Sequence, residues 1–154
     1  MIDSKTEGID GRVDALWLKR MKRGPMDTIT KMVLVVGKGL LGNADQGGRR
    51  QITIMEREMW EQVMKQTHGQ LSASARRANI LISGLRLAKS RKRILLIGAC
   101  RIRVLGETKP CERMEEAHPG LQEAMAHDWA GGVFGEVLED GVIQIGDAVS
   151  WEPR

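Results

Sequence analysis

The sequence predicts a mainly β protein, a compact closed or strongly bent β-barrel with a few short helices. Three observations predict this fold class. Short apolar or alternating segments recur along the chain, 18 glycines interrupt them, and few segments have apolar residues at helical spacing. Many short strands broken by turns favour a barrel over a parallel sheet. A chain of 154 residues is expected to form one domain spanning residues 1–154, and to bury about two-thirds of the surface of its unfolded chain.

The first half of the chain is expected to supply three strands and one helix. Residues 12–18 have apolar side chains on both faces, as barrel strands often do, and residues 28–36 are rich in β-branched residues. Each range predicts a strand, and residues 51–55 predict a third. Residues 56–66 carry methionines, a valine and a tryptophan at helical spacing, which predicts a helix whose apolar side chains pack in the core.

The second half is expected to be built from further short strands, predicted at residues 79–83, 94–97, 100–104, 133–139 and 142–145, with a last one ending at Trp151. Gly98 is interpreted as a bulge or bend between two of these strands. Asp140-Gly141 predicts a hairpin that pairs 133–139 with 142–145. Two short helices are predicted, at residues 112–117 and 120–129.

A glycine-rich loop follows the second predicted strand. Gly37–Gly42 matches the dinucleotide pattern G-x-G-x-x-G, but a glycine-rich segment follows it where that site needs a helix. The sequence therefore argues against nucleotide binding by this loop. The loop leads to Arg49 and Arg50, and it either closes over an anionic ligand or is a plain surface turn.

The two cysteines of the chain are expected in different environments. Cys100 lies in an alternating strand pattern with arginines on the other face, which predicts that Cys100 is in the core. Pro110 has no backbone donor for a sheet, and it leads Cys111 into a loop. Cys111 is therefore expected to be reachable by solvent or a ligand.

The charges around Cys111 act in opposite directions. Lys109, Arg113 and the start of the helix predicted at 112–117 favour a thiolate, whereas the glutamates in that helix oppose it. Cys111 is thus the candidate nucleophile of the chain. The three histidines lack the spacing of an ordinary metal site and are interpreted as non-ligands.

Motifs along most of the chain resemble one family. They are Gly47-Gly48-Arg49-Arg50-Gln51, Asn79-Ile80, Ile97-Gly98, Lys109-Pro110-Cys111, His118-Pro119-Gly120-Leu121, Gly131-Gly132-Val133 and Gly146-Asp147. This set resembles the MOSC domain, named for the C-terminal domain of molybdenum cofactor sulfurases. Gly42-Asn43 departs from the pattern, since the family often has Asp or His after that glycine. The resemblance implies a compact β-barrel with small helices.

The resemblance also implies a ligand and a role for Cys111. The ligand is the molybdenum cofactor (molybdopterin), and Cys111 would either hold a persulfide or ligate molybdenum, for which a soft thiolate is suited. Arg49, Arg50 and Lys109 are expected to form a cationic rim that holds the cofactor's phosphate, with Arg113 beside them. The carboxamide of Asn79 either contacts a pterin edge or closes a turn.

Composition narrows the location and the classes of partner. The net charge is +4 with a pI near 9.3, yet there is no tyrosine and only one phenylalanine, which argues against single-stranded nucleic acid. No apolar run approaches a membrane span, the first residues lack a signal peptide's apolar region, and two cysteines are too few for a disulfide framework. We therefore expect a cytoplasmic protein that binds neither nucleic acid nor membrane.

Three functional interpretations remain open from the sequence. The first is a cofactor-binding or sulfur-carrier domain, a sulfurtransferase if it is an enzyme. Because 154 residues leave no room for a pyridoxal-phosphate domain, its sulfur would come from a cysteine desulfurase or another donor. The second is a small molybdenum-dependent reductase that acts on N-hydroxylated bases or similar compounds, with a reductase as electron donor. The third is a barrel interaction module in which Cys111 is merely structural.

Overall fold

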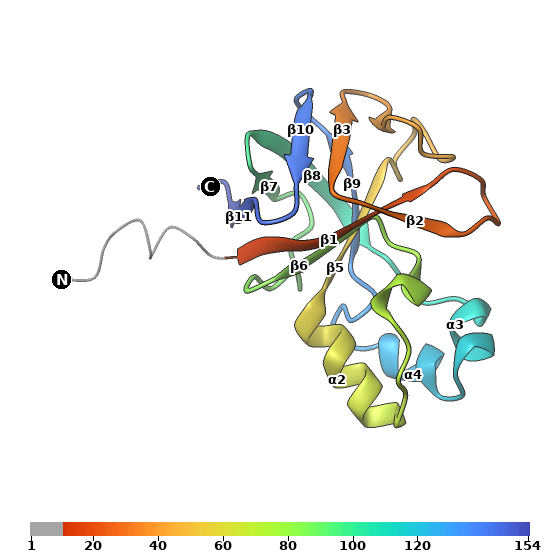
Figure 1. Cartoon of the computed structure of the whole chain (residues 1–154). Coiled ribbons are helices and arrows are strands. Elements are labelled where there is room, and N and C mark those ends of the chain that lie inside the picture. The colour runs from red at the N-terminus through yellow and green to blue at the C-terminus, as the bar shows by residue number, and fades with distance from the viewer. Residues whose placement is uncertain (1–10) are drawn as a thin grey trace.

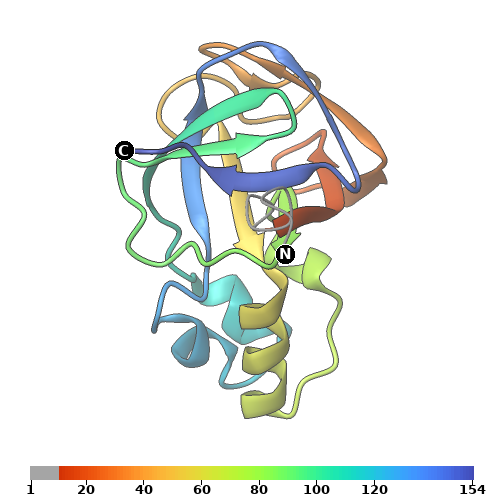
Figure 2. The same cartoon turned by 90° about the vertical axis from the view of Figure 1, so that its left-hand side faces the viewer.

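The computed structural model describes residues 11–154 (Figures 1 and 2). The expectation about the N-terminal segment falls on residues 1–10 and lies outside the described residues. Within the described range, seven strands close into a barrel in the order β11-β7-β8-β9-β5-β6-β1, and β1 pairs with β11 to complete it. The strands of this barrel are β1 (Gly11–Lys19), β5 (Ile52–Glu56), β6 (Ile80–Ser83), β7 (Ile94–Ile97), β8 (Cys100–Glu107), β9 (Val133–Val137) and β11 (Ala148–Trp151).

The other elements lie around this barrel. The strand β2 (Met26–Ile29) pairs with β1 but is not one of the seven strands that close the barrel. The strands β3 (Lys31–Val35), β4 (Gly39–Leu40) and β10 (Gly141–Gln144) form a separate small sheet. The helices are α2 (Arg57–Thr67), the 3₁₀ turn η1 (Ala73–Arg76), α3 (Glu112–Ala117) and α4 (Leu121–Met125). Figures 1 and 2 show α2, α3 and α4 together at one end of the barrel and the small sheet at the opposite end. The predicted class, a mainly β barrel with a few short helices, is confirmed.

The core has two parts. The first fills the barrel with side chains that alternate inward along the strands, including Leu16, Ile54, Ile102 and Cys100. The second lies between the barrel and the helices, where the apolar face of α2 packs against Met114 and other residues of the helical end. Cys100 is completely buried, as its alternating pattern predicted.

One predicted strand and one predicted strand pairing are wrong. The range 28–36 divides at Thr30 into β2 and β3, which belong to different sheets. The hairpin across Asp140-Gly141 does not form, because β9 pairs with β5 and β8 while β10 pairs with β3. The chain crosses between sheets at this point, and the Asp140 carboxylate accepts a hydrogen bond from the Val36 amide at 2.7 Å.

Of the two forms predicted for Gly98, the bend is confirmed and the bulge is wrong. Gly98 and Ala99 form the two-residue turn of the β7–β8 hairpin, with Ile97 opposite Cys100. The irregularity of β8 lies further on, between Val104 and Gly106, where the register against β9 shifts. No helix in residues 11–154 has the length and apolar character needed to cross a membrane.

Candidate functional site

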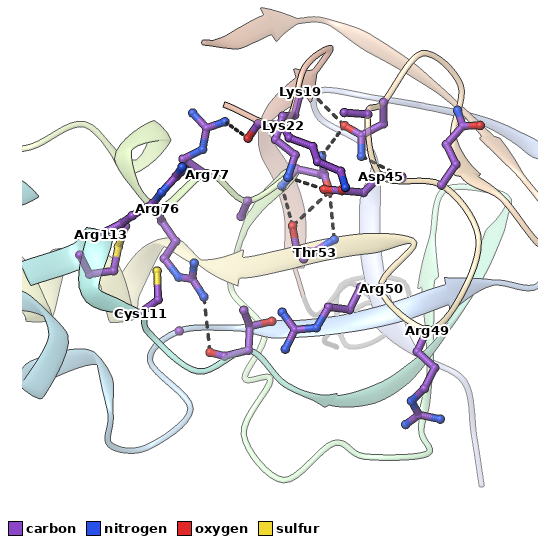
Figure 3. Close-up of a pocket in the computed structure, with 18 of the residues that line it drawn as sticks. Lys19, Lys22, Asp45, Arg49, Arg50, Thr53, Arg76, Arg77, Cys111 and Arg113 are labelled. Carbon is purple, nitrogen blue, oxygen red and sulfur yellow. Dashed lines mark hydrogen bonds and ion pairs between the residues drawn. The ribbon is translucent and has the colours of Figure 1, made fainter. Parts of the chain in front are cut away.

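A cavity of about 690 Å³ lies against the outer surface of the barrel, beside the helical end (Figure 3). Five parts of the chain that are distant in sequence meet there. They are the end of β1 with the turn after it, the glycine-rich loop and β5, the segment from η1 to Asn79, the segment around Cys111, and Gly131 before β9. The cavity therefore exists only in the folded chain.

The lining of this cavity is strongly cationic. Its basic side chains are Lys19, Lys22, Arg49, Arg50, Arg76, Arg77 and Arg113, and its one carboxylate belongs to Asp45. Asp45 is already paired with Lys19. Among the described residues, no carboxylate forms an ion pair with the other six basic side chains, so the cavity has a net positive charge suited to an anion.

Arg76 is the most unusual of these cations. Its side chain is 9% exposed, its Nε atom is buried without a hydrogen-bond partner in the described structure, and its Nη2 reaches the Thr108 carbonyl only at 3.5 Å. Burial lowers the pKa of the Arg76 guanidinium; the charge of Cys111 opposes this lowering and that of Arg50 adds to it. Because arginines are rarely buried unless they are paired, the orphaned donor indicates a place for a bound anion.

The backbone around Arg76 is packed closely enough to hold it in place. A Cβ added at Gly131 would lie 2.1 Å from the Thr108 carbonyl oxygen and 3.4 Å from Nη2 of Arg76. Only glycine leaves room for these three groups to meet. The hydroxyl of Thr108 is a second buried polar group without a partner, and it belongs to the same cavity wall.

Cys111 lines the cavity and is exposed, whereas Cys100 is buried in the barrel (Figure 3). Cys111 is the residue immediately before α3, and its extended backbone sets the direction in which the helix begins. Burial raises the pKa of the Cys100 thiol, and nearby acidic groups, Asp147 first among them, raise it further. The environments predicted for the two cysteines are both confirmed.

The structure brings together most of the other predicted site residues. Arg49, Arg50, Asn79 and Arg113 line the cavity with Cys111. Arg50 also lies over the ring of Phe134, with its guanidinium carbon 4.7 Å from the ring centroid. Lys109 is exposed and is not among the lining residues, so its role stays a prediction.

Asn79 has a clear structural role. Its Oδ1 accepts hydrogen bonds from the amide and the hydroxyl of Thr53, both at 3.1 Å. Its Nδ2 donates to the carbonyl of Trp17 and to Oδ1 of Asn43, both at 3.3 Å. The carboxamide therefore ties β5, β1 and the glycine-rich loop to the start of β6, with both ends occupied by protein groups. This geometry supports the alternative in which the side chain closes local structure.

Several cavity residues were not singled out from the sequence as site residues. Lys19, Lys22, Arg76 and Arg77 lie in basic clusters whose individual placement the sequence does not reveal. The available signal was the clustering itself. Asn43, which departs from the family pattern, has a structural role. Its Oδ1 accepts a hydrogen bond from the Lys19 amide at 3.0 Å and another from Nδ2 of Asn79.

The histidines lie outside this cavity. Nε2 of His118 is 2.7 Å from the Thr67 carbonyl oxygen, His127 is paired with Glu123, and His68 ends α2 with a left-handed backbone. Within the described part of the chain, no group of three His, Cys, Asp or Glu side chains could hold a metal ion.

Comparison with known proteins identifies the family. The model of the MOSC domain matches residues 37–150. No curated protein matches the chain at a significant level. The YUAD protein from Bacillus subtilis has a similar structure, with a TM-score of 0.77 and 18% sequence identity over 92% of this chain and 97% of that one. YiiM from Geobacillus stearothermophilus (TM-score 0.75, 16% identity, 94% and 76% covered) and YiiM from Escherichia coli (TM-score 0.71, 17% identity, 93% and 70% covered) also share the fold. Because the family model matches residues 37–150, which is most of the chain and includes the Cys111 segment, this chain belongs to the MOSC domain family.

Proposed function

We propose that the protein binds the molybdenum cofactor in the cavity at Cys111. The MOSC domain family is associated with molybdenum-cofactor binding. The observation that carries the proposal is Arg76, a buried guanidinium with an orphaned Nε in a cavity that also holds an exposed thiol. Such a donor set suits a ligand that is anionic at one end and has a soft metal at the other.

The residues present fit the cofactor's two chemical features. The guanidinium groups of Arg76, Arg50 and Arg113 would bind its phosphate, since an arginine fork matches phosphate oxygens. The thiolate of Cys111 would be the protein's ligand to molybdenum. When bound, the cofactor would supply a redox-active metal centre. The role of the chain is to bind and orient it, with the cavity volume of about 690 Å³ in the usual range for cofactor sites.

The exposure of Cys111 supports a second form of the same proposal, in which the residue carries sulfur. The Cys111 thiolate would attack the terminal sulfur of a donor's persulfide, so that a new S–S bond forms on Cys111 while the donor's S–S bond breaks and its thiolate leaves. A cysteine desulfurase is the class of donor that supplies such a group. An exposed cavity-edge thiol gives a partner protein access, and a reducing cytoplasm would keep it free.

A reductase remains the second candidate function. In that form Cys111 would ligate molybdenum permanently, the partner would be an electron donor, and the substrate would be an N-hydroxylated base or similar compound. Mass spectrometry distinguishes the sulfur carrier from the reductase. A sulfur carrier incubated with a desulfurase and cysteine gains the mass of one sulfur on the Cys111 peptide, whereas a permanent ligand in cofactor-loaded protein does not.

An inert barrel is disfavoured by the energetic cost of the cavity. A desolvated arginine without an anionic partner destabilises the folded state, and a protein without a ligand has no use for it. Six unpaired cations in one cavity repel one another as well. Both features are explained if an anion binds there.

The proposal is tested by the cofactor content of protein made in a host that synthesises the molybdenum cofactor. Molybdenum is measured by elemental analysis and pterin by fluorescence after oxidation. We expect both in the parent protein, and a loss of about tenfold or more in Arg76→Met, because the charge-assisted bonds to phosphate are removed. Arg12→Met is the matched control, since Arg12 is exposed on β1 outside the cavity. Absence of both molybdenum and pterin from the parent protein would refute the proposal.

A further inference from the structure

A second basic cavity lies away from Cys111. It has a volume of about 430 Å³, and its charged lining residues are Arg91, Lys92, Arg93, Arg154 and Glu152. Residues 91–93 are three consecutive basic residues in the sequence. None of the residues that line the Cys111 cavity takes part in this one.

The charges of this second cavity are not neutralised within the described residues. Both carboxylate oxygens of Glu152 are bound by Arg101, at 2.8 and 3.1 Å. This bidentate bond lowers the pKa of Glu152, so the carboxylate stays ionised and committed to Arg101. No ion pair of the described structure involves Arg91, Lys92 or Arg93.

The Arg93 guanidinium is oriented by an aromatic ring, and its Nε donor has no hydrogen-bond partner among the described residues. Its guanidinium carbon lies 4.6 Å from the ring centroid of Trp151, and its Nε atom is buried without a hydrogen-bond partner. A guanidinium fixed on an aromatic ring loses little further freedom when it binds an anion. An unsatisfied buried donor in a basic cavity is the feature that also marks Arg76 in the first cavity.

The turn that presents these cations is strained. Lys89 and Lys92 both have a left-handed backbone, with φ of 58° and 73°, which for a residue with a Cβ costs about 1 kcal/mol. Two hydrogen bonds stabilise this turn conformation. The Lys92 amide donates to the Val104 carbonyl at 2.8 Å, and the Ser90 hydroxyl donates to the Leu87 carbonyl at 2.6 Å. A glycine would be less strained at 92, so a lysine there is consistent with a use for its charge.

A row of arginine and aromatic side chains joins the two cavities. Arg50 lines the first cavity and lies over Phe134, and Arg91 lines the second. Gly106 lies between them: a Cβ there would be 3.0 Å from the Phe134 ring and 3.7 Å from Nη2 of Arg91. Arg91 lies in turn over Trp129, at 5.9 Å from its ring centroid. A ligand with two phosphates could therefore contact guanidinium groups along the whole row.

We propose that the cavity of Arg91, Lys92 and Arg93 is a second phosphate-binding subsite, which takes a phosphate or pyrophosphate group. A volume of about 430 Å³ accommodates a group of this size. The phosphate has two conceivable sources: the nucleotide half of one extended ligand whose other half lies at Cys111, or a separate nucleotide. The subsite does not depend on the cofactor assignment, whereas the extended ligand rests on the proposed function.

The test uses the cofactor-free protein and the indole N–H signal of Trp151, observed by NMR during titration with adenosine monophosphate and with inorganic pyrophosphate. Because Arg93 lines this cavity and lies over the Trp151 ring, the Trp151 signal reports binding to Arg93. The indole of Trp60 donates to the Leu71 carbonyl at the helical end and serves as the internal reference. We expect Trp151 to shift saturably while Trp60 does not move.

The matched variants are Lys92→Gly and Lys89→Gly. Both remove one lysine from a left-handed position, so both relieve strain, but only Lys92 lines the cavity. We expect Lys92→Gly to raise the Kd read from Trp151 about tenfold and Lys89→Gly to leave it unchanged. Arg91→Gln should weaken binding similarly. A Trp151 signal that does not respond, or equal weakening in the two glycine variants, would overturn the subsite.

The source of the phosphate is decided on cofactor-loaded protein. Release of equimolar pterin and nucleoside monophosphate on hydrolysis identifies one extended ligand. Pterin without nucleotide rules out the extended ligand, and the titration with adenosine monophosphate then tests a separate nucleotide. Since the titration needs no cofactor, failure of the subsite and failure of the proposed function give different results.

Discussion

At the scale of single residues, the two cysteines differ in their access to solvent. Cys111 is exposed at the cavity, while Cys100 is fully buried with a raised pKa. Brief treatment of the native protein with iodoacetamide at neutral pH should therefore label Cys111 and leave Cys100 unmodified, as measured by mass spectrometry of the peptides. Labelling of Cys100 at a rate equal to that of Cys111 would show that the site has been assigned to the wrong thiol.

Arg76 should reveal a conflict between stability and function. Because its guanidinium is desolvated and lacks an acidic partner, Arg76→Met should leave the free energy of unfolding unchanged or raise it by about 1 kcal/mol. Urea denaturation measures this change in protein without cofactor. A loss of more than about 2 kcal/mol would mean that the arginine is a structural residue and not one kept for a ligand.

The sequence revealed one of these two residues and not the other. Alternation in the 100–104 segment and Pro110 before Cys111 are local signals, and they correctly separated the two cysteines. The burial of Arg76 depends on Gly131 and Thr108, which are far along the chain and approach only after folding. No local pattern distinguishes this arginine from its exposed neighbours.

At the scale of secondary-structure elements, Asn79 connects β6 with β5, β1 and the glycine-rich loop. Its carboxamide makes four hydrogen bonds in a buried environment. Asn79→Ala should lower the free energy of unfolding by about 2–3 kcal/mol, because buried donors and acceptors lose their partners. Thr53→Val, which removes a single hydroxyl, should cost about 1 kcal/mol. Urea denaturation of both variants checks that Asn79→Ala costs more stability than Thr53→Val. A negligible loss of stability in Asn79→Ala would contradict a structural role and favour contact with a ligand.

Glu56 connects the start of α2 with the segment before β7. It is 2% exposed; its Oε2 accepts from the Leu87 amide at 3.0 Å, and its Oε1 lies 3.2 Å from Nε of Arg86. Burial raises its pKa above the ordinary 4.5, against the opposing effects of Leu87 and Arg86. The folded state therefore binds the Glu56 proton more tightly than the unfolded state does. The protonated Glu56 thus stabilises the folded state fully below about pH 4.5, and this stabilisation is lost as the pH rises through the folded-state pKa.

Glu56→Gln tests this sign, because glutamine keeps an acceptor for the Leu87 amide without titrating. The free energy of unfolding of the parent protein, relative to the variant, should fall as the pH rises from about 4 to about 7. Urea denaturation at a series of pH values measures the difference. A parent protein that gains stability over the variant toward neutral pH would mean that the ion pair with Arg86 outweighs burial.

The elements also show where turn chemistry misleads. Asp140-Gly141 has the composition of a tight hairpin, yet the partner of β10 is β3, more than 100 residues earlier. The strand β10 therefore pairs with β3 of the small sheet and not with β9, so turn propensity did not determine this pairing. By contrast, α2 and α3 could be predicted from their periodicity and from the end of the preceding loop, since these signals are local.

At the scale of the whole molecule, the barrel could be predicted as a class but its site could not. Closure depends on β1 pairing with β11 at the other end of the chain, and the cavity depends on five separate parts of the chain meeting outside that barrel. Family resemblance supplied what periodicity could not, namely that Arg49, Arg50, Asn79 and Cys111 would lie together. The structure adds that the cavity cations exceed their acidic partners and that one of them is buried.

The central claim is that this cavity binds the molybdenum cofactor with Cys111 as its sulfur ligand or carrier. The most direct test is the molybdenum and pterin content of Cys111→Ser, a variant close in size to the parent, after expression in a host that makes the cofactor. We predict that the variant folds as the parent does and keeps pterin, because the arginines that bind phosphate are intact, but loses the molybdenum or persulfide sulfur of the parent. Full molybdenum and sulfur content in Cys111→Ser, equal to the parent's, would contradict the account.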